Sequence, residues 1–288
     1  MSDVALIVDE LTEVLRAHDV AEPVQEAREI IAALYDVPRF WPLANAAAPV
    51  EEAIAERARR AAAMRARGAP LAYAVGRANF RHLTLDVDER VLIPRQETEL
   101  LVDLVLDALG GRAGGVAVDV GTGSGAIALA LATEGSFSRV YGVDISRDAL
   151  AVARQNVELT RHLHRAPVDL VHGSLLAPLS DVPARVVASN PPYISYEESG
   201  ALPASVRDWE PAVALFSGGD GLSVTTRLVR EAADVLEPDG LLVLEVDARR
   251  ASLVADLVGR DRRYSDVRVQ LDLTGRERFV LARRQERG

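Results

Sequence analysis

The segment Asn190-Pro191-Pro192-Tyr193 combines residue types that can hold a planar amino group for chemistry. Neither proline has an N–H to donate, each has φ fixed at about −65°, and Pro191 keeps Asn190 out of the α region, so the chain is stiff and extended here. The carboxamide oxygen of Asn190 and the carbonyl oxygen of Pro191 are two acceptors at a fixed separation, and together they can receive both hydrogens of an NH₂ group. Tyr193 offers an aromatic wall for that flat group.

A pair of acceptors of this kind suits a weak nitrogen nucleophile. The lone pair of an amide or exocyclic amine nitrogen is delocalised, so hydrogen bonds from both N–H groups orient the nitrogen and stabilise the positive charge that develops during attack. No strong general base is required beforehand, because the alkylated nitrogen is acidic and can lose its proton to water or to a nearby carbonyl. We therefore predict four catalytic residues: Asn190, Pro191, Pro192 and Tyr193.

A second chemical signal is the stretch VDVGTGSGAIALALA, which predicts a buried strand over 116–120, a glycine turn over 121–125 and then a helix. Glycines let the backbone turn tightly and approach a ligand, and the helix N-terminus offers unpaired N–H groups. About twenty residues later a second strand ends in Asp144, where carboxylates in such folds accept hydrogen bonds from ribose hydroxyls. A turn that only connects strand to helix does not account for this acid.

The spacing of the turn distinguishes between nucleotide cofactors. Dinucleotide turns read G-x-G-x-x-G, whereas this chain has G-x-G-x-G preceded by Asp119, which resembles the first motif of class I S-adenosylmethionine-dependent methyltransferases. The resemblance implies that the turn packs against the adenosyl and methionine portions without binding a phosphate. The implied cofactor-binding residues are Gly121, Thr122, Gly123, Ser124, Gly125, Asp144 and, facing the methyl donor, Asn190.

The elements that must position these residues alternate along the second part of the chain. From residue 116 onward apolar strands alternate with amphipathic helices, which predicts an α/β fold with a mostly parallel sheet covered on both faces. The last two strands, joined by TGRE, are predicted to form an antiparallel pair at one edge. In such sheets ligands bind beyond the carboxyl ends of the strands where strand order reverses, so Asn190 is expected to face the donor.

Three domains are predicted. Residues 1–70 have helical apolar spacing interrupted by prolines, which indicates a small helical domain; we expect it to dock a protein substrate. Residues 71–95 are predicted to form a linking β-hairpin, with Asp88 and Glu89 between its strands. Residues 96–288 are predicted to be the methyltransferase domain, whose first helix Thr98 is expected to cap, whereas Arg95 has no assigned role.

Composition restricts the function classes. The 288 residues include no cysteine and have a net charge of −10, which excludes disulfides and thiolate chemistry and disfavours bulk binding to a phosphate backbone. We expect no metal site. The N-terminus carries acids where a secretory signal has positive charge, and no apolar run reaches 18 residues. We therefore expect a cytoplasmic protein without direct contact to nucleic acid and without contact to a membrane. We also expect a monomer.

Four motifs in order, PRQETELLV, DVGTGSGAIALALA, NPPYIS and VRDWEPAVALFSGGDGL, resemble the bacterial release factor glutamine methyltransferase (PrmC/HemK) family along essentially the whole chain. The resemblance implies a Rossmann-like, seven-stranded mixed sheet and S-adenosylmethionine as donor. It also implies N5-methylation of the glutamine in the Gly-Gly-Gln motif of class I peptide chain release factors. By position, Asn190 to Tyr193 would then bind the target glutamine.

Two positions depart from the family pattern. The family has Asp and often Trp after the third strand, where this chain has Ser174 and Leu175. Leu175 is expected to cover the adenine ring and completes the cofactor-binding set. The family often has Glu-x-Gly after the fifth strand, where this chain reads EVDARR from Glu245 to Arg250. No function is assigned to these six residues.

Three alternative functions stay open on the sequence alone. A large-subunit ribosomal protein glutamine methyltransferase has identical chemistry, although PRQETE and VRDWEP favour the release factor enzyme. Adenine-N6 nucleic-acid methyltransferases share Asn-Pro-Pro-Tyr but need a flipped base and phosphate contacts, which the acidic charge disfavours. The third is a protein that binds the cofactor without catalysis, and the intact Asn190 to Tyr193 segment argues against it.

Overall fold

The computed structural model describes residues 2–286, which form two compact units. The first contains the chain up to Arg77 together with Val87–Glu89 and Pro203–Trp209. The second contains Ala78–Asp86, Arg90–Leu202 and the chain from Glu210 onward. Each unit has its own buried apolar core.

The first unit is helical, as the proline-interrupted spacing predicts. The side chains of Val4, Ile7, Leu11 and Leu15 are fully buried, at the spacing of one helix face. Asp3 caps this first helix by accepting a hydrogen bond from the Leu6 N–H at 2.9 Å. The unit contains α1 (Val4–Arg16), α2 (Pro23–Tyr35), α3 (Trp41–Ala44), α4 (Glu52–Ala66), α5 (Leu71–Val75) and α9 (Ala204–Arg207).

The predicted pair of short strands is present, but its turn was misplaced. β1 (Arg77–Phe80) and β2 (Leu83–Asp86) form a two-stranded sheet. The connection is Arg81-His82, with Arg81 at φ +55°, whereas the alternation of apolar residues suggested a turn at Asp88 and Glu89. Part of the predicted hairpin segment, Leu71–Val75, is helical instead.

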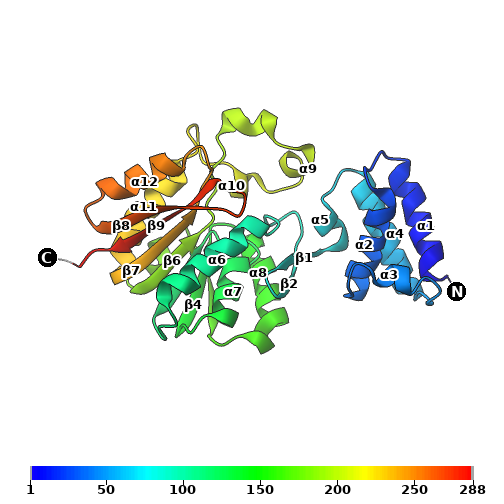
Figure 1. Ribbon diagram of the computed structural model, residues 1–288, viewed down its shortest axis with the longest axis horizontal. Coiled ribbons are helices and arrows are strands. Elements are labelled where there is room, and N and C mark those ends of the chain that lie inside the picture. The colour runs from blue at the N-terminus through cyan, green and yellow to red at the C-terminus, as the bar shows by residue number, and fades with distance from the viewer. Residues whose placement is uncertain (1, 287–288) are drawn as a thin grey trace. The chain divides into compact units, whose positions relative to one another are not determined.

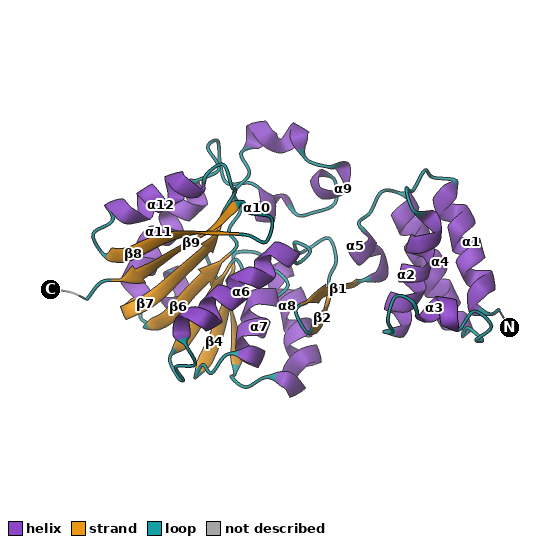
Figure 2. Cartoon of the chain, viewed as in Figure 1, coloured by secondary structure: helices purple, strands orange, loops and turns teal. Residues whose placement is uncertain are grey.

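The second unit is built on a seven-stranded mixed sheet, which confirms the predicted fold class (Figures 1 and 2). Strands β3 to β7 are parallel, whereas β9 is antiparallel to both β7 and β8, so the last two strands form the predicted pair at one edge. The order is β5-β4-β3-β6-β7-β9-β8, and the strands are β3 (Val116–Val120), β4 (Arg139–Asp144), β5 (Val168–His172), β6 (Ala184–Ser189), β7 (Leu236–Glu245), β8 (Tyr264–Leu271) and β9 (Glu277–Arg284).

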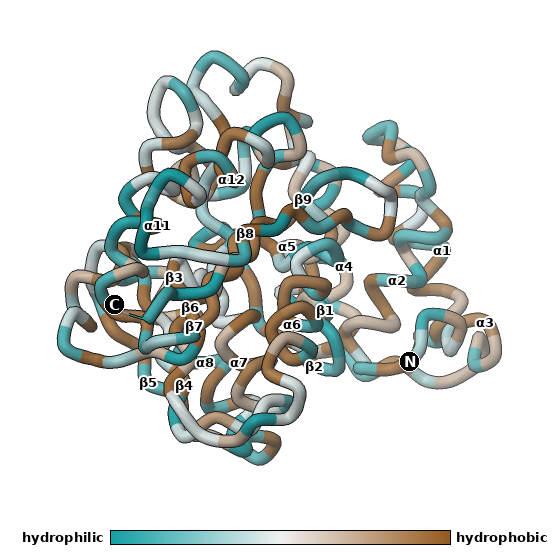
Figure 3. The backbone as a smooth tube through the Cα atoms, turned by 60° about the vertical axis from the view of Figure 1, so that its left-hand side comes forward, coloured by the Kyte–Doolittle hydropathy of each residue, from teal (hydrophilic) through white to brown (hydrophobic). Residues whose placement is uncertain are grey.

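Helices cover both faces of this sheet. Successive strand residues point to opposite faces: Ala117 packs in one core cluster with residues of α6 and α7, and Val118 packs in the other with residues of α11 and α12. α7 is buried along nearly its whole length, and its tube is mostly brown because its residues are hydrophobic (Figure 3). The helices are α6 (Gln96–Leu109), α7 (Ala126–Glu134), α8 (Arg147–Thr160), α10 (Ala212–Leu215), α11 (Ser223–Val235) and α12 (Ala251–Arg260), with short 3₁₀ helices at Arg161–Leu163, Ala177–Leu179 and Tyr196–Ala201.

Strand order reverses between β3 and β6. The chain continues from β3 to β4 on one side, whereas β6 pairs with β3 and the chain continues to β7 on the other side. The Ser189 hydroxyl donates to the carbonyl of Val120 at 2.6 Å, which ties the two carboxyl ends together. The glycine turn and Asn190 therefore start from adjacent strand ends, at the place where such sheets bind ligands.

Candidate active site

The glycine turn leaves space on one side and packs tightly on the other. Gly121, Gly123 and Gly125 all have positive φ, at 73°, 53° and 88°, a region that side chains other than glycine rarely adopt. A Cβ added at Gly121 or Gly123 would meet no atom within 4 Å, whereas one at Gly125 would lie 3.3 Å from Cδ1 of Leu129. The first two glycines therefore keep open a space for a ligand, and the third lets α7 start close to the turn.

Asp119 holds the turn from behind. Its Oδ2 accepts hydrogen bonds from the Thr122 hydroxyl at 2.6 Å and from the Ala128 N–H at 3.1 Å. The carboxyl group is fully buried, and burial raises its pKa to about 7. Thr122 and Ser124 are also buried. These side chains therefore shape the turn.

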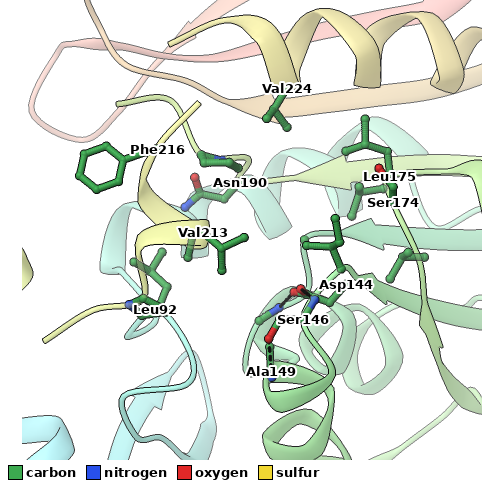
Figure 4. A pocket seen from close by; sticks show the side chains of 18 of the residues that line it. Leu92, Asp144, Ser146, Ala149, Ser174, Leu175, Asn190, Val213, Phe216 and Val224 are labelled. Carbon is green, nitrogen blue, oxygen red and sulfur yellow. Dashed lines mark hydrogen bonds between the residues drawn. The ribbon is translucent and has the colours of Figure 1, made fainter. Parts of the chain in front are cut away.

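Asp144 lies at the end of β4 beside the turn. Its Oδ2 accepts a hydrogen bond from the Gly123 N–H at 2.9 Å, and its Oδ1 accepts one from the Ser146 N–H at 2.8 Å (Figure 4). Burial raises the pKa of this carboxyl group, and the backbone N–H groups act against that rise. A carboxylate oxygen can accept more than one hydrogen bond, so Asp144 is held in place while lone pairs remain for a ligand.

A pocket of about 520 Å³ joins the two predicted ends of the site, a volume typical of small-molecule sites. Figure 4 shows Asn190, Leu92, Val213 and Phe216 on one side, and Asp144, Ser174 and Leu175 on the other. Six of the predicted site residues line it: Gly121, Gly123, Asp144, Leu175, Asn190 and Pro192. Five others do not: Thr122, Ser124, Gly125, Pro191 and Tyr193.

A chain of hydrogen bonds runs from Asn190 into the protein. The Asn190 Nδ2 donates to the Thr98 hydroxyl at 3.1 Å, and that hydroxyl donates to Oε2 of Glu245 at 2.7 Å. Thr98 and Glu245 are 5% and 2% exposed. The expectation that Thr98 caps α6 was wrong: the N-cap residue is Arg95, without a side-chain cap. Thr98 instead lies on the buried face of α6, at helical spacing from Leu101 and beside β7.

Two ionisable groups near Asn190 have a raised pKa. Burial raises the pKa of Glu245 to about 7, although the hydrogen bond from Thr98 and the charges of Arg278 and Arg95 act in the other direction. Burial raises the pKa of Tyr193 to about 12, and the charge of Glu245 adds to that rise. The Tyr193 phenol therefore stays neutral at physiological pH.

Arg95, which the sequence left unassigned, pairs with the glutamate of the WEP motif. Its Nη2 lies 2.6 Å and 2.7 Å from the two carboxylate oxygens of Glu210, whose side chain is 1% exposed. Close by in sequence, the Ile194 N–H donates to the carbonyl of Leu215 at 3.0 Å, and the Ser217 N–H donates back to Ile194 at 2.9 Å. The segment after Asn190 is thereby joined to 210–217.

Sequence reasoning missed the apolar wall of the pocket. Val213 of the one-turn helix α10 is 54% exposed and lines the pocket together with Leu92, Phe216 and Val224. The ring of Phe216 stacks on that of Tyr196, with centroids 5.4 Å apart. The available signal was the apolar run AVALF directly after the WEP motif, which is unusual in a loop.

None of the helices in the described part of the chain has the length and apolarity that a membrane crossing needs.

Comparisons with known proteins identify both parts of the chain. A model of the methyltransferase small domain matches residues 96–202, and a model of the PrmC N-terminal domain matches residues 7–76. Among solved structures, the catalytic domain of hMettl16 in complex with a MAT2A 3′UTR hairpin has a TM-score of 0.57 over 83% of this chain and 82% of that one. At 16% identity, that likeness concerns the fold alone.

Curated relatives are considerably closer in sequence. A release factor glutamine methyltransferase from Gloeobacter violaceus is 43% identical over 219 residues, which cover 76% of each protein. One from Moorella thermoacetica is 39% identical over 272 residues, which cover 94% of this chain and 95% of the relative. The chain therefore belongs to the family of release factor glutamine methyltransferases.

Proposed function

We propose that this enzyme transfers a methyl group from S-adenosylmethionine to the side-chain amide N5 of the glutamine in the Gly-Gly-Gln motif of class I peptide chain release factors. The observation that carries the proposal is the pocket that contains both Asp144 and Asn190, in a chain that belongs to this family. One pocket can then bind a nucleoside at one end and an amide at the other.

The residues of the pocket fit S-adenosylmethionine. Asp144 has lone pairs for two ribose hydroxyls, and the open space beside Gly121 and Gly123 admits the ligand close to the backbone. Leu175 lines the same end and would cover the adenine ring. We assign Thr122, Ser124 and Gly125 to the same cofactor-binding turn, as the residues that fix its shape. The bound cofactor supplies a methyl group already activated on a sulfonium.

The other end of the pocket would orient the target amide. The Asn190 Oδ1 and the Pro191 carbonyl would accept the two N–H groups of the glutamine side chain, which sets the direction of the nitrogen lone pair. These acceptors also stabilise the positive charge that develops on nitrogen during attack. Pro192 keeps the segment stiff, and Tyr193 packs behind it. After transfer, the nitrogen loses its proton to water or to one of these carbonyls.

The helical first unit would dock the protein substrate. The PrmC N-terminal model covers most of this part of the chain, and its surface exposes Leu6, Phe40 and Leu43, each by more than half. We propose the domain limits 1–70, 71–95 and 96–288. The net charge of −10 supports a protein substrate without direct nucleic-acid contact. We further propose that the enzyme acts as a monomer in the cytoplasm.

A competition assay tests the substrate. Release factor and large-subunit ribosomal protein are mixed at equal concentration with labelled S-adenosylmethionine, and the initial rates of label transfer are compared. The proposal predicts that the release factor receives at least ~10-fold more label, a discrimination worth about 1.4 kcal/mol in the transition state. Preferential labelling of the ribosomal protein would establish that protein as the substrate. Label in RNA or DNA, added in a parallel reaction, would contradict both protein substrates.

A further inference from the structure

We propose that Thr98 and Glu245 form a positioning relay that fixes which end of the Asn190 carboxamide faces the target amide. The inference rests on the proposed role of Asn190. Neither residue would touch substrate or cofactor, and both would act through Asn190. The proposal is carried by two consecutive buried hydrogen bonds, at 3.1 Å and 2.7 Å.

The two ends of a carboxamide have nearly the same shape and opposite chemistry. The oxygen accepts hydrogen bonds, whereas the NH₂ group only donates them. An NH₂ substrate needs the oxygen of Asn190, because the flipped side chain would place donor against donor. Stiffness of Pro191 and Pro192 fixes the backbone but not the rotation of the Asn190 amide. Something else must therefore set the amide direction.

The hydroxyl of Thr98 supplies that direction because it has a single proton. An ionised Glu245 can only accept, so the proton of Thr98 is committed to Oε2. The Thr98 hydroxyl can then only accept a hydrogen bond from Asn190. The donor must be Nδ2, because the amide oxygen has no proton to give. The oxygen of Asn190 is thereby left for the pocket. The Glu245 carboxylate therefore sets the direction, from donor to acceptor, of both hydrogen bonds.

The burial of the Glu245 carboxyl group costs folding free energy, and a functional role would explain why the residue is kept. A carboxyl group with 2% exposure at the end of β7 loses most of its hydration, and a well-packed apolar residue in such a place is often no less stable. The ionisable groups that act on Glu245 are Arg278 on β9, Arg95 and Glu97 at the start of α6, and Tyr193 after β6. The two arginines favour the ionised form.

Protonation of Glu245 would reverse the relay. A carboxylic acid can donate to Thr98, which would then donate its own proton to the Asn190 oxygen. Burial raises the pKa of Glu245 to about 7. Both hydrogen bonds of the relay should therefore reverse direction as the pH falls below neutrality. Methyl transfer should decline with it.

The test compares substitutions that change the relay while keeping the shape of the side chains. Thr98→Val removes the hydroxyl, Thr98→Ser keeps it, and Glu245→Gln removes the group that can only accept. Thr133→Val is the matched control, because Thr133 is equally buried and its hydroxyl bonds only to backbone carbonyls of α7. Two readouts are taken: single-turnover methylation of release factor, and the NMR resonances of the Asn190 side-chain NH₂ in enzyme without substrate.

The relay predicts that Thr98→Val lowers the turnover rate about 10- to 100-fold, with KM for release factor and affinity for S-adenosylmethionine within about threefold. Thr98→Ser should restore most of the rate. Glu245→Gln should lower the rate about tenfold and flatten its decline below neutral pH. The Asn190 NH₂ resonances should shift in Thr98→Val and stay in place in Thr133→Val.

Wild-type rate and unshifted Asn190 resonances in Thr98→Val would overturn the relay. So would a Thr98→Ser variant as slow as Thr98→Val, because the methyl group and not the hydroxyl would then matter. If the wild-type enzyme leaves release factor unmethylated, the proposed function fails. The NMR comparison still decides the relay in that case, since it needs no substrate.

Discussion

The carboxylate of Asp144 is held by two backbone N–H groups, and Asn190 is held by a side chain. This difference matches the two roles proposed for them. A rigid carboxylate suits tight binding of ribose hydroxyls, whereas an oriented amide suits an interaction that strengthens in the transition state. Substitutions at the two positions should therefore affect different measured quantities.

Asp144→Ala should weaken the binding of S-adenosylmethionine at least ~100-fold, because two hydrogen bonds to a charged group are lost and each is worth about 1.5–3 kcal/mol. The turnover rate at saturating cofactor should fall less. Isothermal titration calorimetry measures the affinity, and Asp169→Ala on the neighbouring strand β5 is the control, since Asp169 pairs with Arg139 outside the pocket. Unchanged affinity in Asp144→Ala would refute the ribose assignment.

Single residues differ in how readily the sequence reveals them. Asn190 and Asp144 could be selected because each follows a predicted strand within a short motif. Thr98 and Glu245 are 147 residues apart, and Arg95 and Glu210 are 115 apart. No local spacing predicts such pairs. The position of Thr98 on the apolar face of its helix was nevertheless a usable signal, since a polar residue there must find a buried partner.

At the scale of elements, the site depends on how β6 and the segments around it are joined. The ion pair between Arg95 and Glu210 connects the start of α6 to the segment that carries α10. The two backbone hydrogen bonds of Ile194 connect the same segment to the chain after Asn190. The apolar wall that includes Val213 and Phe216 is therefore held on two sides.

Arg95→Leu should loosen this wall, because it leaves the Glu210 carboxyl group buried without its partner. Amide hydrogen exchange in residues 210–217 should become at least ~10-fold faster, and KM for release factor should rise. Exchange is measured by mass spectrometry. Arg139→Leu removes an exposed pair with Asp169 and should leave that segment unchanged.

An Arg95→Leu variant with wild-type exchange in 210–217 would show that the backbone hydrogen bonds alone hold the wall. In that case the geometry of the pocket would not depend on the ion pair.

The β1–β2 connection illustrates why one element was placed wrongly. Arg81 adopts a left-handed backbone conformation, which non-glycine residues rarely do and which leaves no signal in the sequence. Tertiary contacts stabilise it: the Arg81 N–H donates to Glu99 at 2.9 Å, and its guanidinium pairs with Glu134 and Asp103. Most of the regular strands and helices were predictable because apolar periodicity indicates them, whereas this turn depends on residues far away in the chain.

At the scale of the whole molecule, the two compact units do not correspond to two continuous stretches of sequence. The proposed domain limits are continuous in sequence, whereas the first compact unit also contains Val87–Glu89 and Pro203–Trp209. The amino-acid composition of these short segments does not distinguish them from their neighbours in the sequence. Their assignment depends on the folded contacts of the chain.

Whole-molecule stability should depend on the buried acid Asp119. Its pKa rises from about 3.9 in an unfolded chain to about 7 in the folded protein. Between these values the folded state binds more protons, so the free energy of unfolding decreases as pH rises. Asp119→Asn has no such proton to lose. Its stability relative to wild type should therefore increase by up to about 1.4 kcal/mol per pH unit from about pH 5 to 7.

Urea unfolding of both proteins at a series of pH values measures this difference. All other titrating groups are common to the two proteins, so their contributions cancel. A stability difference that does not change with pH would mean that Asp119 stays ionised in the folded enzyme.

The central claim is that Asn190 orients the target amide while other residues bind the cofactor. Single-turnover methylation of release factor by Asn190→Ala, with the affinity for S-adenosylmethionine measured on the same preparation, tests it most directly. We predict a rate at least ~100-fold below wild type, the scale of losing one transition-state hydrogen bond, with cofactor affinity within about threefold. A rate close to wild type, or equal losses of rate and cofactor affinity, would contradict the claim.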